Sequence, residues 1–315
     1  MEKHILLVVA GPTASGKTAC AVELALLMNG EVISADSMQI YKGMDVLSAK
    51  PTRKEMKGVR HHLLGFVDPR ERYTADAYRA DAKFAIEEIV QRGKLPMLCG
   101  GTGLYINAVT RPMSFSEQSD EKMHEELMQI GATASGRKQL FDILREIDPD
   151  SAARLHENDV RRVTRAIEIF RLTGKTQTEQ MRLDREREGD YREIIFAPDW
   201  PREELYRRIG VRVDEMIKCG LVEEVRRLIK DEERHPTALQ AIGYKEIAAA
   251  LRGEISMSEA VEWTKQATRH LAKRQLTWFK RDERVIWINA EGKTAREMAE
   301  EMHRMIVERF GCEVI

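Results

Sequence analysis

The sequence predicts an α/β fold, with a three-layer core around a mostly parallel sheet and an inserted all-helical domain. Short, continuously apolar runs alternate with longer runs of helical periodicity, which is typical of parallel strands covered by helices on both faces. A stretch of about 80 residues then contains no convincing strand, which indicates an inserted subdomain. The length of 315 residues suits about two domains.

The strands and helices are predicted from hydrophobic periodicity. Each expected strand is a short apolar run, often followed by Gly, Asp or Pro. We expect strands over Ile5–Ala10, Val32–Ala35, Pro96–Cys99, Ile194–Ala197 and Val285–Ile288. The segments between them carry apolar residues at helical spacing. We expect helices over Lys17–Met28, Ala75–Arg92, Arg202–Asp231 and Ser256–Lys280.

The inserted helical domain is expected over residues 113–191, so that residues 1–112 and 192–315 form the core. Within the insertion, we expect helices to begin near Ser116, Ser135 and Asn158. The segment Arg182–Tyr191 alternates dense positive and negative charge, which is typical of a solvated connection.

Composition limits the classes of function. Lys and Arg total 51 and Asp and Glu total 52, so the formal net charge is -1 at pH 7. This total argues against attachment to nucleic acid by bulk charge, although a local basic surface is compatible with it. No apolar run approaches the ~18 residues of a membrane span. The scattered Cys20, Cys99, Cys219 and Cys312 have no zinc-ligand spacing and suit a reducing compartment, so we expect a cytoplasmic protein.

Residues Gly11–Thr18 match the phosphate-loop pattern GxxxxGK[ST] at every fixed position. A predicted strand precedes the motif and a predicted helix follows it, which is the context that the motif requires. The glycines let backbone amides turn toward phosphate oxygens, and the helix adds the positive end of its dipole. Lys17 supplies a charge for the terminal phosphate, and Thr18 a hydroxyl for Mg²⁺. The motif therefore predicts a diphosphate or triphosphate ligand without identifying it.

Asp36 follows the second predicted strand, in the run Asp36-Ser37-Met38-Gln39. Ligands of open parallel sheets bind outside the carboxyl ends of the strands, so Asp36 faces the phosphate loop if its strand is the neighbour of the first. Three interpretations stay open: a partner acid for Mg²⁺, a general base for a nucleophile, or a cap of the next turn. Gln39 has an amide able to read a base edge, but alone it is weak support.

A second glycine-rich segment, Cys99–Tyr105, follows the third predicted strand. Its three glycines permit close approach of the backbone either to a ligand or to another part of the protein. The sequence favours neither alternative. We expect Thr102, within this segment, to point into the same crevice as Asp36.

The adjacent residues His61 and His62 lie in a polar segment. Imidazole is a common metal ligand, but a zinc site needs further ligands at suitable spacing. No third ligand is near in the sequence, so we predict no metal site here.

Basic residues are concentrated in Thr264–Arg281, which contains no Asp or Glu. At about 100° per residue, one face of a helix there holds Lys265, Arg269, Lys273 and Lys280. Another face holds Ala260, Ala267, Leu271 and Trp278. We therefore predict an amphipathic helix with a basic edge, which suits phosphate contacts along a polynucleotide.

Two other groups of basic residues are candidates for binding anions. The first lies in the predicted insertion, in the run Arg161-Arg162-Val163-Thr164-Arg165. The second comprises Arg207, Arg208 and Arg212 in the helix after the fourth strand, where Arg208 and Arg212 are one turn apart and share a face. Either group is also able to pair with nearby Glu residues.

Taken together, the ordered motifs closely resemble those of the tRNA dimethylallyltransferase family, also called tRNA isopentenyltransferases. The resemblance rests on GPTASGKT (11–18), DSMQIY (36–41), HHL (61–63), GGTGLY (100–105), GYKEI (243–247) and TRHLAKRQLTWFKR (268–281). It covers essentially the whole chain, with no departure at the motif positions. The zinc finger of eukaryotic members is absent, so the resemblance is to the bacterial type.

The resemblance implies transfer of a dimethylallyl group from dimethylallyl diphosphate to the exocyclic amine of the adenosine 3′-adjacent to the anticodon in tRNA, with release of diphosphate. It implies a P-loop α/β core with an inserted helical domain that grips the anticodon stem-loop, in agreement with the periodicity. The phosphate loop then holds the diphosphate of the prenyl donor rather than ATP. We expect Mg²⁺ as the cofactor and a monomer.

The resemblance also implies roles for individual residues. Asp36 is the expected general base, and Lys17, Thr18 and Arg212 are expected at the leaving group, with Thr18 as the Mg²⁺ ligand. The residues expected to bind diphosphate are Gly11, Thr13, Ala14, Ser15, Gly16, Lys17, Thr18 and Arg208. Those expected to contact tRNA are Asp36, Ser37, Met38, Gln39, Thr102, Arg161, Arg162, Val163, Thr164, Arg165, Lys265, Arg269, Lys273 and Lys280.

Three other functions stay open at this point. An adenylate prenyltransferase acting on free nucleotide shares the phosphate loop but has no use for a long basic face or an RNA-gripping insertion. A P-loop small-molecule kinase needs lid arginines and an acceptor pocket. A non-catalytic RNA-binding NTPase switch predicts nucleotide-dependent RNA affinity without prenyl transfer.

Overall fold

The chain divides into two compact units in the computed structural model, which describes residues 3–114, 120–230 and 240–311. The core unit comprises Met1–Thr110 and Tyr191–Ile315, and the helical unit comprises Arg111–Asp190. The corresponding boundaries predicted from the sequence lie after residues 112 and 191. No described helix has the length and apolar character needed to cross a membrane.

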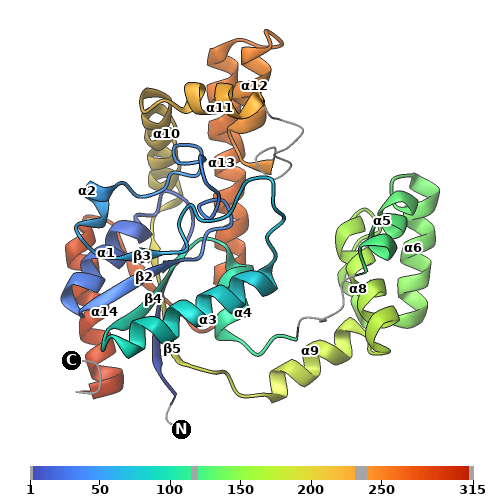
Figure 1. Ribbon diagram of the computed structural model, residues 1–315, viewed down its shortest axis with the longest axis horizontal. Helices are drawn as coiled ribbons and strands as arrows, with labels where there is room; N and C mark the ends of the chain where they lie inside the picture. Colours follow the sequence, from blue (N-terminus) through green and yellow to red (C-terminus); the bar gives the residue numbers. More distant parts are fainter. Residues whose placement is uncertain (1–2, 115–119, 231–239, 312–315) are drawn as a thin grey trace. The chain divides into compact units, whose positions relative to one another are not determined.

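The core unit is built on a parallel sheet in the order β3-β2-β4-β1-β5-β6 (Figure 1). Its strands are β1 (Ile5–Ala10), β2 (Gly30–Ser34), β3 (His61–His62), β4 (Leu95–Gly100), β5 (Arg192–Asp199) and β6 (Val285–Asn289). All five predicted strands form, whereas the short edge strand β3 was not predicted. Strand β2 is not the neighbour of β1, because β4 lies between them and pairs with both.

Helices cover both faces of the sheet, which confirms the predicted three-layer α/β fold. The side chains of β1 alternate: Leu7 and Val9 pack with α1 and α14, and Leu6 and Val8 pack with α3 and α4. The helices of the core unit are α1 (Lys17–Leu27), α2 (Arg53–Met56), α3 (Ala75–Gln91), α4 (Gly103–Thr110), α10 (Arg202–Lys218), α11 (Leu221–Ile229), α12 (Tyr244–Leu251), α13 (Met257–Lys280) and α14 (Ala295–Phe310).

Two sequence predictions about helices are wrong. The helix expected over Arg202–Asp231 is two helices, α10 and α11, because Gly220 adopts a left-handed conformation with φ 96° between them. The expected connection Arg182–Tyr191 is helical in its first half, which belongs to α9. That helix begins with a capping box between Thr176 and Glu179, a local signal that outweighs the high charge of the segment.

The helical unit has its own small core. Its helices are α5 (Glu121–Ile130), α6 (Ala134–Ile147), α7 (Pro149–Arg154), α8 (Val160–Thr173) and α9 (Gln177–Glu186). The buried residues that unite α5, α6 and α8 include Leu127, Leu140, Leu144, Val163 and Ile167, whereas α9 contributes no buried residue. Helices α6 and α8 begin next to the expected starts at Ser135 and Asn158, whereas Ser116 lies outside the described residues.

Helix α13 spans 24 residues and turns a different face inward from the one expected. Its buried side chains are those of Ala260, Thr264, Ala272 and Phe279. Trp278, which was expected on the apolar face, is 46% exposed. Ala260 was predicted on the apolar face, but the buried face is offset from the predicted one, because Thr264, Ala272 and Phe279 were not recognised as core residues.

A buried carboxylate joins the edge strand β3 to the rest of the sheet. Glu31 of β2 is 2% exposed, and its carboxylate lies 2.7 Å from His62 Nε2, 2.8 Å from Arg92 and 3.4 Å from Lys94. Burial disfavours the charged form, but hydrogen bonds from Arg92 and His62 outweigh it and lower the pKa of Glu31 to about 2.

We predict that Glu31→Gln lowers the free energy of unfolding by about 2–3 kcal/mol at neutral pH. The folded state lowers the pKa of Glu31, so the ionised carboxylate stabilises the folded state. This stabilisation is complete above about pH 4.5 and is lost as the pH falls toward about 2. Urea unfolding of both proteins at neutral pH and near pH ~3 should therefore show the difference shrinking on acidification. A difference independent of pH would contradict this account.

Candidate functional site

The phosphate loop joins the end of β1 to the start of α1. Ala14 and Gly16 adopt left-handed conformations, with φ 62° and 85°, and this curls the loop around the first turn of α1. The hydroxyl of Ser15 is buried inside the curl and has no hydrogen-bond partner among the described residues. An unpaired buried hydroxyl at a helix N-terminus suits a phosphate oxygen as its partner.

Trp200, which directly follows β5, and Arg208 of α10 hold the loop from outside. Trp200 Nε1 donates a hydrogen bond to the carbonyl of Ser15 at 2.8 Å. Arg208 Nε donates to the carbonyl of Ala14 at 2.9 Å, and its guanidinium stacks 4.3 Å from the centroid of the Trp200 ring. Arg208, a predicted diphosphate ligand, also lines a cavity of about 280 Å³ together with Gly16 and Arg212. It therefore braces the loop and borders an open space beside it.

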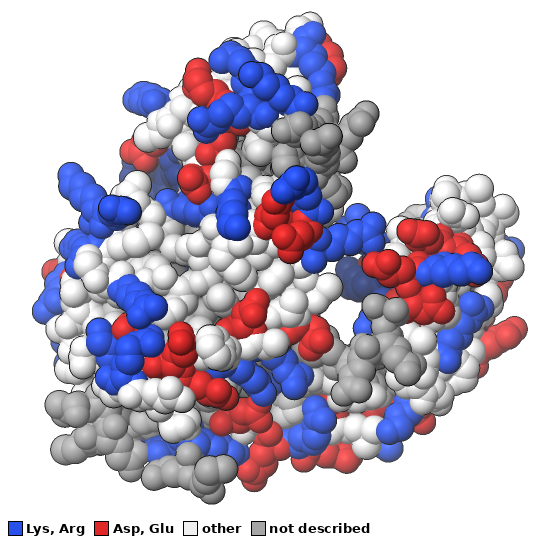
Figure 2. All heavy atoms as spheres, in the orientation of Figure 1, with Lys and Arg blue, Asp and Glu red and all other residues white. Residues whose placement is uncertain are grey.

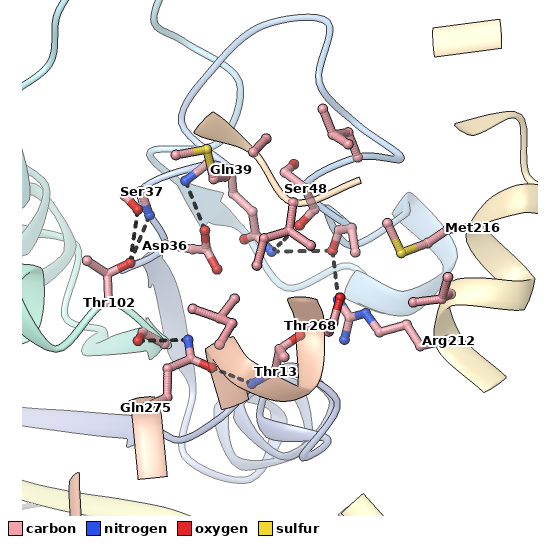
Figure 3. A pocket seen from close by; sticks show the side chains of 18 of the residues that line it. Thr13, Asp36, Ser37, Gln39, Ser48, Thr102, Arg212, Met216, Thr268 and Gln275 are labelled. Atoms are coloured by element: carbon pink, nitrogen blue, oxygen red, sulfur yellow. Dashed lines mark hydrogen bonds between the residues drawn. The ribbon is translucent and has the colours of Figure 1, made fainter. Parts of the chain in front are cut away.

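Nine of the predicted site residues of the core unit line a larger cavity of about 360 Å³ (Figure 3). The other predicted residues of the core unit do not line it: Gly11, Ala14, Ser15, Gly16, Arg208, Lys265, Arg269, Lys273 and Lys280. Its polar lining comes from the phosphate loop, the segment after β2, the second glycine loop, α10 and α13, and includes Thr13, Lys17, Thr18, Asp36, Ser37, Gln39, Thr102, Arg212, Thr268, Arg274 and Gln275. Apolar side chains of Met38, Leu47, Val213, Met216 and Leu271 line it too. An apolar pocket with convergent polar groups is typical of a site for a small organic ligand.

The cavity carries an excess of buried positive charge. Lys17 is 9% exposed, and its pKa is lowered by burial and then by Arg212, while Asp36 opposes the shift. Burial also lowers the pKa of Arg212, again against the effect of Asp36. Lys17 and Arg212 therefore share the cavity with the single carboxylate of Asp36, and the exposed Arg274 adds a third cation to the lining. A polyanion such as diphosphate would compensate this charge.

Asp36 reaches the cavity even though β4 separates its strand from β1. Its Oδ1 accepts a hydrogen bond from the backbone amide of Met38 at 2.9 Å, which is the turn contact considered from the sequence. In Figure 3 the carboxyl group points into the cavity. The turn contact and a chemical role are compatible, because a carboxylate has further lone pairs available.

Two of the predicted tRNA contacts near Asp36 are engaged within the protein. The hydroxyl of Thr102 accepts a hydrogen bond from the amide of Ser37 at 3.0 Å. The amide group of Gln39 accepts from Ser34 at 3.0 Å and donates to the carbonyls of Ser48 and Ala49 at 3.4 and 3.3 Å. Gln39 therefore holds the 48–49 segment in this structure, which leaves its amide little capacity to read a base.

The second glycine loop fits closely against other parts of the protein. A Cβ at Gly100 would overlap the backbone of Ala35, and one at Gly103 would overlap Trp278. At Gly101 it would overlap Gln275. Packing within the chain thus accounts for these glycines, one of the two alternatives that the sequence left open.

Gln275 of α13 is a site residue that the sequence reasoning missed. Its Oε1 accepts from the amide of Thr13 at 2.8 Å, and its Nε2 donates to the carbonyl of Gly101 at 2.9 Å (Figure 3). One side chain thus joins the phosphate loop to the second glycine loop. The sequence feature that indicates Gln275 is an uncharged amide inside the basic run, one helical turn after Leu271. Both residues lie on the side of the helix that lines the cavity.

The predicted RNA contacts of the helical unit divide by burial. Val163 and Thr164 are buried in the core of that unit, so direct contact of their side chains with RNA does not fit this structure. Arg161 and Arg162 are exposed, and Arg162 pairs with Asp159 at 2.7 Å. Arg165 is partly buried and lies 3.2 Å from Glu168.

The basic face of α13 is less uniform than predicted. Lys265 is largely covered and pairs with Asp214 of α10 and with Glu262, each at 2.9 Å, so acids outside the 264–281 run neutralise it. Lys273 and Lys280 are exposed, whereas Arg269 is partly buried. On the face drawn in Figure 2, Lys and Arg are interspersed with Asp and Glu rather than gathered in one field.

Among the described residues, no cluster of His, Cys, Asp and Glu has the size of a metal centre built by the protein alone. The described cysteines are all free: Cys20 and Cys99 are buried and Cys219 is exposed. Burial raises the pKa of Cys99 to about 11, with opposing effects from Lys17 and Thr18. This thiol is therefore protonated and unreactive at neutral pH.

The model of the family described as IPP transferase matches residues 39–282. A tRNA dimethylallyltransferase of Caldanaerobacter subterraneus subsp. tengcongensis is 45% identical over 304 residues, covering 95% of this chain and 96% of the relative. The tRNA dimethylallyltransferase of Bacillus subtilis strain 168 is 43% identical over 287 residues, covering 91% of each chain.

Solved structures show the same similarity. The tRNA isopentenylpyrophosphate transferase of Bacillus halodurans matches with a TM-score of 0.73 and 39% identity, covering 98% of this chain and 97% of the other. A eukaryotic dimethylallyltransferase acting on tRNA matches with a TM-score of 0.81 and 27% identity, covering 97% of this chain and 79% of the other.

The charge imbalance in the cavity predicts opposite effects of one substitution on stability and on anion binding. Arg212→Met removes a buried cation that repels Lys17, so the melting temperature of the free protein should be unchanged or raised. The same change should weaken binding of inorganic diphosphate by about tenfold or more, through loss of a charge-assisted contact.

Calorimetric titration and thermal unfolding measure these two effects. The matched control is Arg226→Met, which removes an exposed arginine of α11 that lies 3.9 Å from Glu223 and lines neither cavity. Equal diphosphate affinity in the two variants would show that Arg212 does not serve the anion.

Proposed function

Because this chain belongs to the IPP transferase family, we propose that it transfers a dimethylallyl group from dimethylallyl diphosphate to the exocyclic amine of the adenosine 3′-adjacent to the anticodon in tRNA. Diphosphate is the other product. The observation that carries the proposal is the cavity in which Asp36 faces two buried cations beside the phosphate loop. The cavity thus combines a proton acceptor for the adenine amine with an anion site for the diphosphate of the donor.

The leaving group is the diphosphate of the prenyl donor. As the C–O bond breaks, negative charge grows on the diphosphate oxygens. The phosphate-loop residues Gly11, Thr13, Ala14, Ser15 and Gly16 are proposed to surround these oxygens, with the Ser15 hydroxyl and the loop amides other than that of Thr13, which donates to Gln275. Lys17, Arg208 and Arg212 supply positive charge. Groups already fixed in a water-poor site stabilise such charge without reorganising.

Asp36 is proposed as the general base. The adenine amine attacks the allylic carbon, the new N–C bond forms as the C–O bond breaks, and the amine proton passes to the Asp36 carboxylate. An adenosine in a structured loop reaches such a pocket after leaving its stack. Ser37, Met38, Gln39 and Thr102 then border the base from the segments beside Asp36. The apolar side chains of Met216 and Leu271 suit the hydrocarbon tail of the donor.

The residues present also fit a divalent cation. The hydroxyl of Thr18, at the start of α1, lines the cavity together with the carboxylate of Asp36, and Mg²⁺ prefers oxygen donors while taking most of its ligands from phosphates and water. We propose Thr18 as its protein ligand. When bound, Mg²⁺ neutralises charge on the diphosphate.

The RNA partner is proposed to be the anticodon stem-loop of tRNA. Arg161, Arg162 and Arg165 of the helical unit would contact the RNA, and Lys265, Arg269, Lys273 and Lys280 of α13 would contact its phosphates. We further propose a monomer that acts in the cytoplasm. The exposed cations of α13 and the helical unit favour tRNA over a free nucleotide, which needs neither, and no feature of the cavity specifically favours a kinase reaction.

Transfer of label from dimethylallyl diphosphate into unmodified tRNA, in the presence of Mg²⁺, tests the function. Asp36→Asn keeps an oxygen for the Met38 amide but removes the base, so its single-turnover rate should fall by ~10²-fold or more with little change in substrate affinity. ATP turnover on a small acceptor without label in the RNA would contradict the proposed function. An unchanged rate for Asp36→Asn would restrict Asp36 to a structural role.

Lys273 tests the RNA-binding role of α13. Lys273→Ala removes an exposed cation, so tRNA should bind more weakly and the slope of log affinity against log salt should become shallower by about one. The control is Arg304→Ala, which removes an exposed cation of α14 outside the proposed contact face. Filter binding over a salt series measures both variants, and identical slopes would remove Lys273 from the interface.

A further inference from the structure

The adjacent histidines of β3 have different surroundings, because successive side chains of a strand point to opposite faces. His62 Nε2 lies 2.7 Å from Glu31. His61 Nδ1 instead lies 3.0 Å from the carbonyl oxygen of Val59. A carbonyl oxygen only accepts hydrogen bonds, so Nδ1 carries the proton of the neutral ring and Nε2 is left as an acceptor.

Nε2 of His61 is buried, and no described residue forms a hydrogen bond with it. Burial lowers the pKa of His61 most, and the nearby His62 lowers it further, while the hydrogen bond to the Val59 carbonyl raises it. The net shift is downward, so the ring is neutral at neutral pH. A buried acceptor without a partner costs about 1–3 kcal/mol. His61 Nε2 therefore needs a hydrogen-bond donor, and no described residue of the protein supplies one.

His61 lines a small cavity of about 10 Å³ that adjoins the catalytic site. Thr18, Asp36 and Gln39 line the same cavity. Its volume is about that needed by one water molecule, and a buried water requires two to four polar partners. The Met38 amide engages only Oδ1 of Asp36, so the carboxylate has capacity for a second donor.

We propose that one water molecule occupies this cavity and donates one hydrogen bond to His61 Nε2 and the other to the Asp36 carboxylate. His61 is then a positioning residue, which fixes the orientation of the base through the water without touching the substrates. The water has two protons to donate, and His61 Nε2 and the Asp36 carboxylate both accept, while Lys17 and the Thr18 hydroxyl in the same lining are able to donate to its oxygen. The role of Asp36 as the base rests on the proposed function, whereas the water site does not.

Two substitutions distinguish the two nitrogens of His61. Asn at position 61 keeps an N–H near Nδ1 for the Val59 carbonyl but has no group at the position of Nε2. Gln at position 61 reaches the position of Nε2. Crystal structures of the wild type and His61→Asn, at a resolution that shows ordered water, should contain the water in the wild type and lack it, or show it displaced, in the variant. An empty cavity in the wild type would overturn the proposal.

Kinetics test the positioning role. His61→Asn should lower the single-turnover rate of transfer about tenfold while KM for both substrates is unchanged, and His61→Gln should restore most of the rate. In the Asp36→Asn background, His61→Asn should have no further effect, because the base that it positions is gone. The positioning role would be overturned if His61→Asn and His61→Gln lowered the rate equally, or if the rate losses of His61→Asn and Asp36→Asn were fully additive. A wild-type protein that transfers no dimethylallyl group would refute the proposed function, while the crystals would still decide the water site.

Discussion

The site depends on keeping two cations buried beside each other. Lys17 and Arg212 share one cavity with a single carboxylate, Asp36. Burial lowers the pKa of both cations, and Arg212 lowers that of Lys17 further, while Asp36 raises both and Glu55 and Glu215 also raise that of Arg212. Such an arrangement is unfavourable in the free protein and favourable once a polyanion arrives. The rest of the fold holds these groups in place against that cost, and the diphosphate proposed to bind here would provide the compensating charge.

The supports of the cavity come from segments far apart in the chain. Gln275 of α13 joins the phosphate loop to the second glycine loop, and Trp200 and Arg208 hold the phosphate loop from its other side. Gln39 holds the 48–49 segment, whose Ala49 carbonyl also accepts from Arg212 at 3.5 Å. Helix α13 contributes both Gln275 and the exposed Lys273, so the helix proposed to bind RNA also contacts the phosphate loop.

Local patterns in the sequence were sufficient for the five longer strands, for the phosphate loop and for the position of Asp36. They failed where tertiary packing decides the outcome. Strand β3 is too short for a periodic signal, and Gly220 divides a helix whose apolar spacing continues across it.

Some predicted site residues also differ in their surroundings. Val163 and Thr164 lie in a basic run, yet they are buried in the core of the helical unit, and the charge on Lys265 is neutralised by Asp214 of another helix. The role of Gln275 depends on contacts across 262 and 174 residues of chain, which a single sequence does not encode in any short pattern.

We propose that the buried positive charge serves a diphosphate leaving group rather than ATP. The most direct test is the stoichiometry of the reaction, measured as diphosphate released and dimethylallyl groups incorporated into tRNA in the same samples, without ATP. We expect one diphosphate for each group transferred, and no release when tRNA is omitted. Diphosphate release uncoupled from RNA labelling, or transfer that requires ATP hydrolysis, would contradict the account.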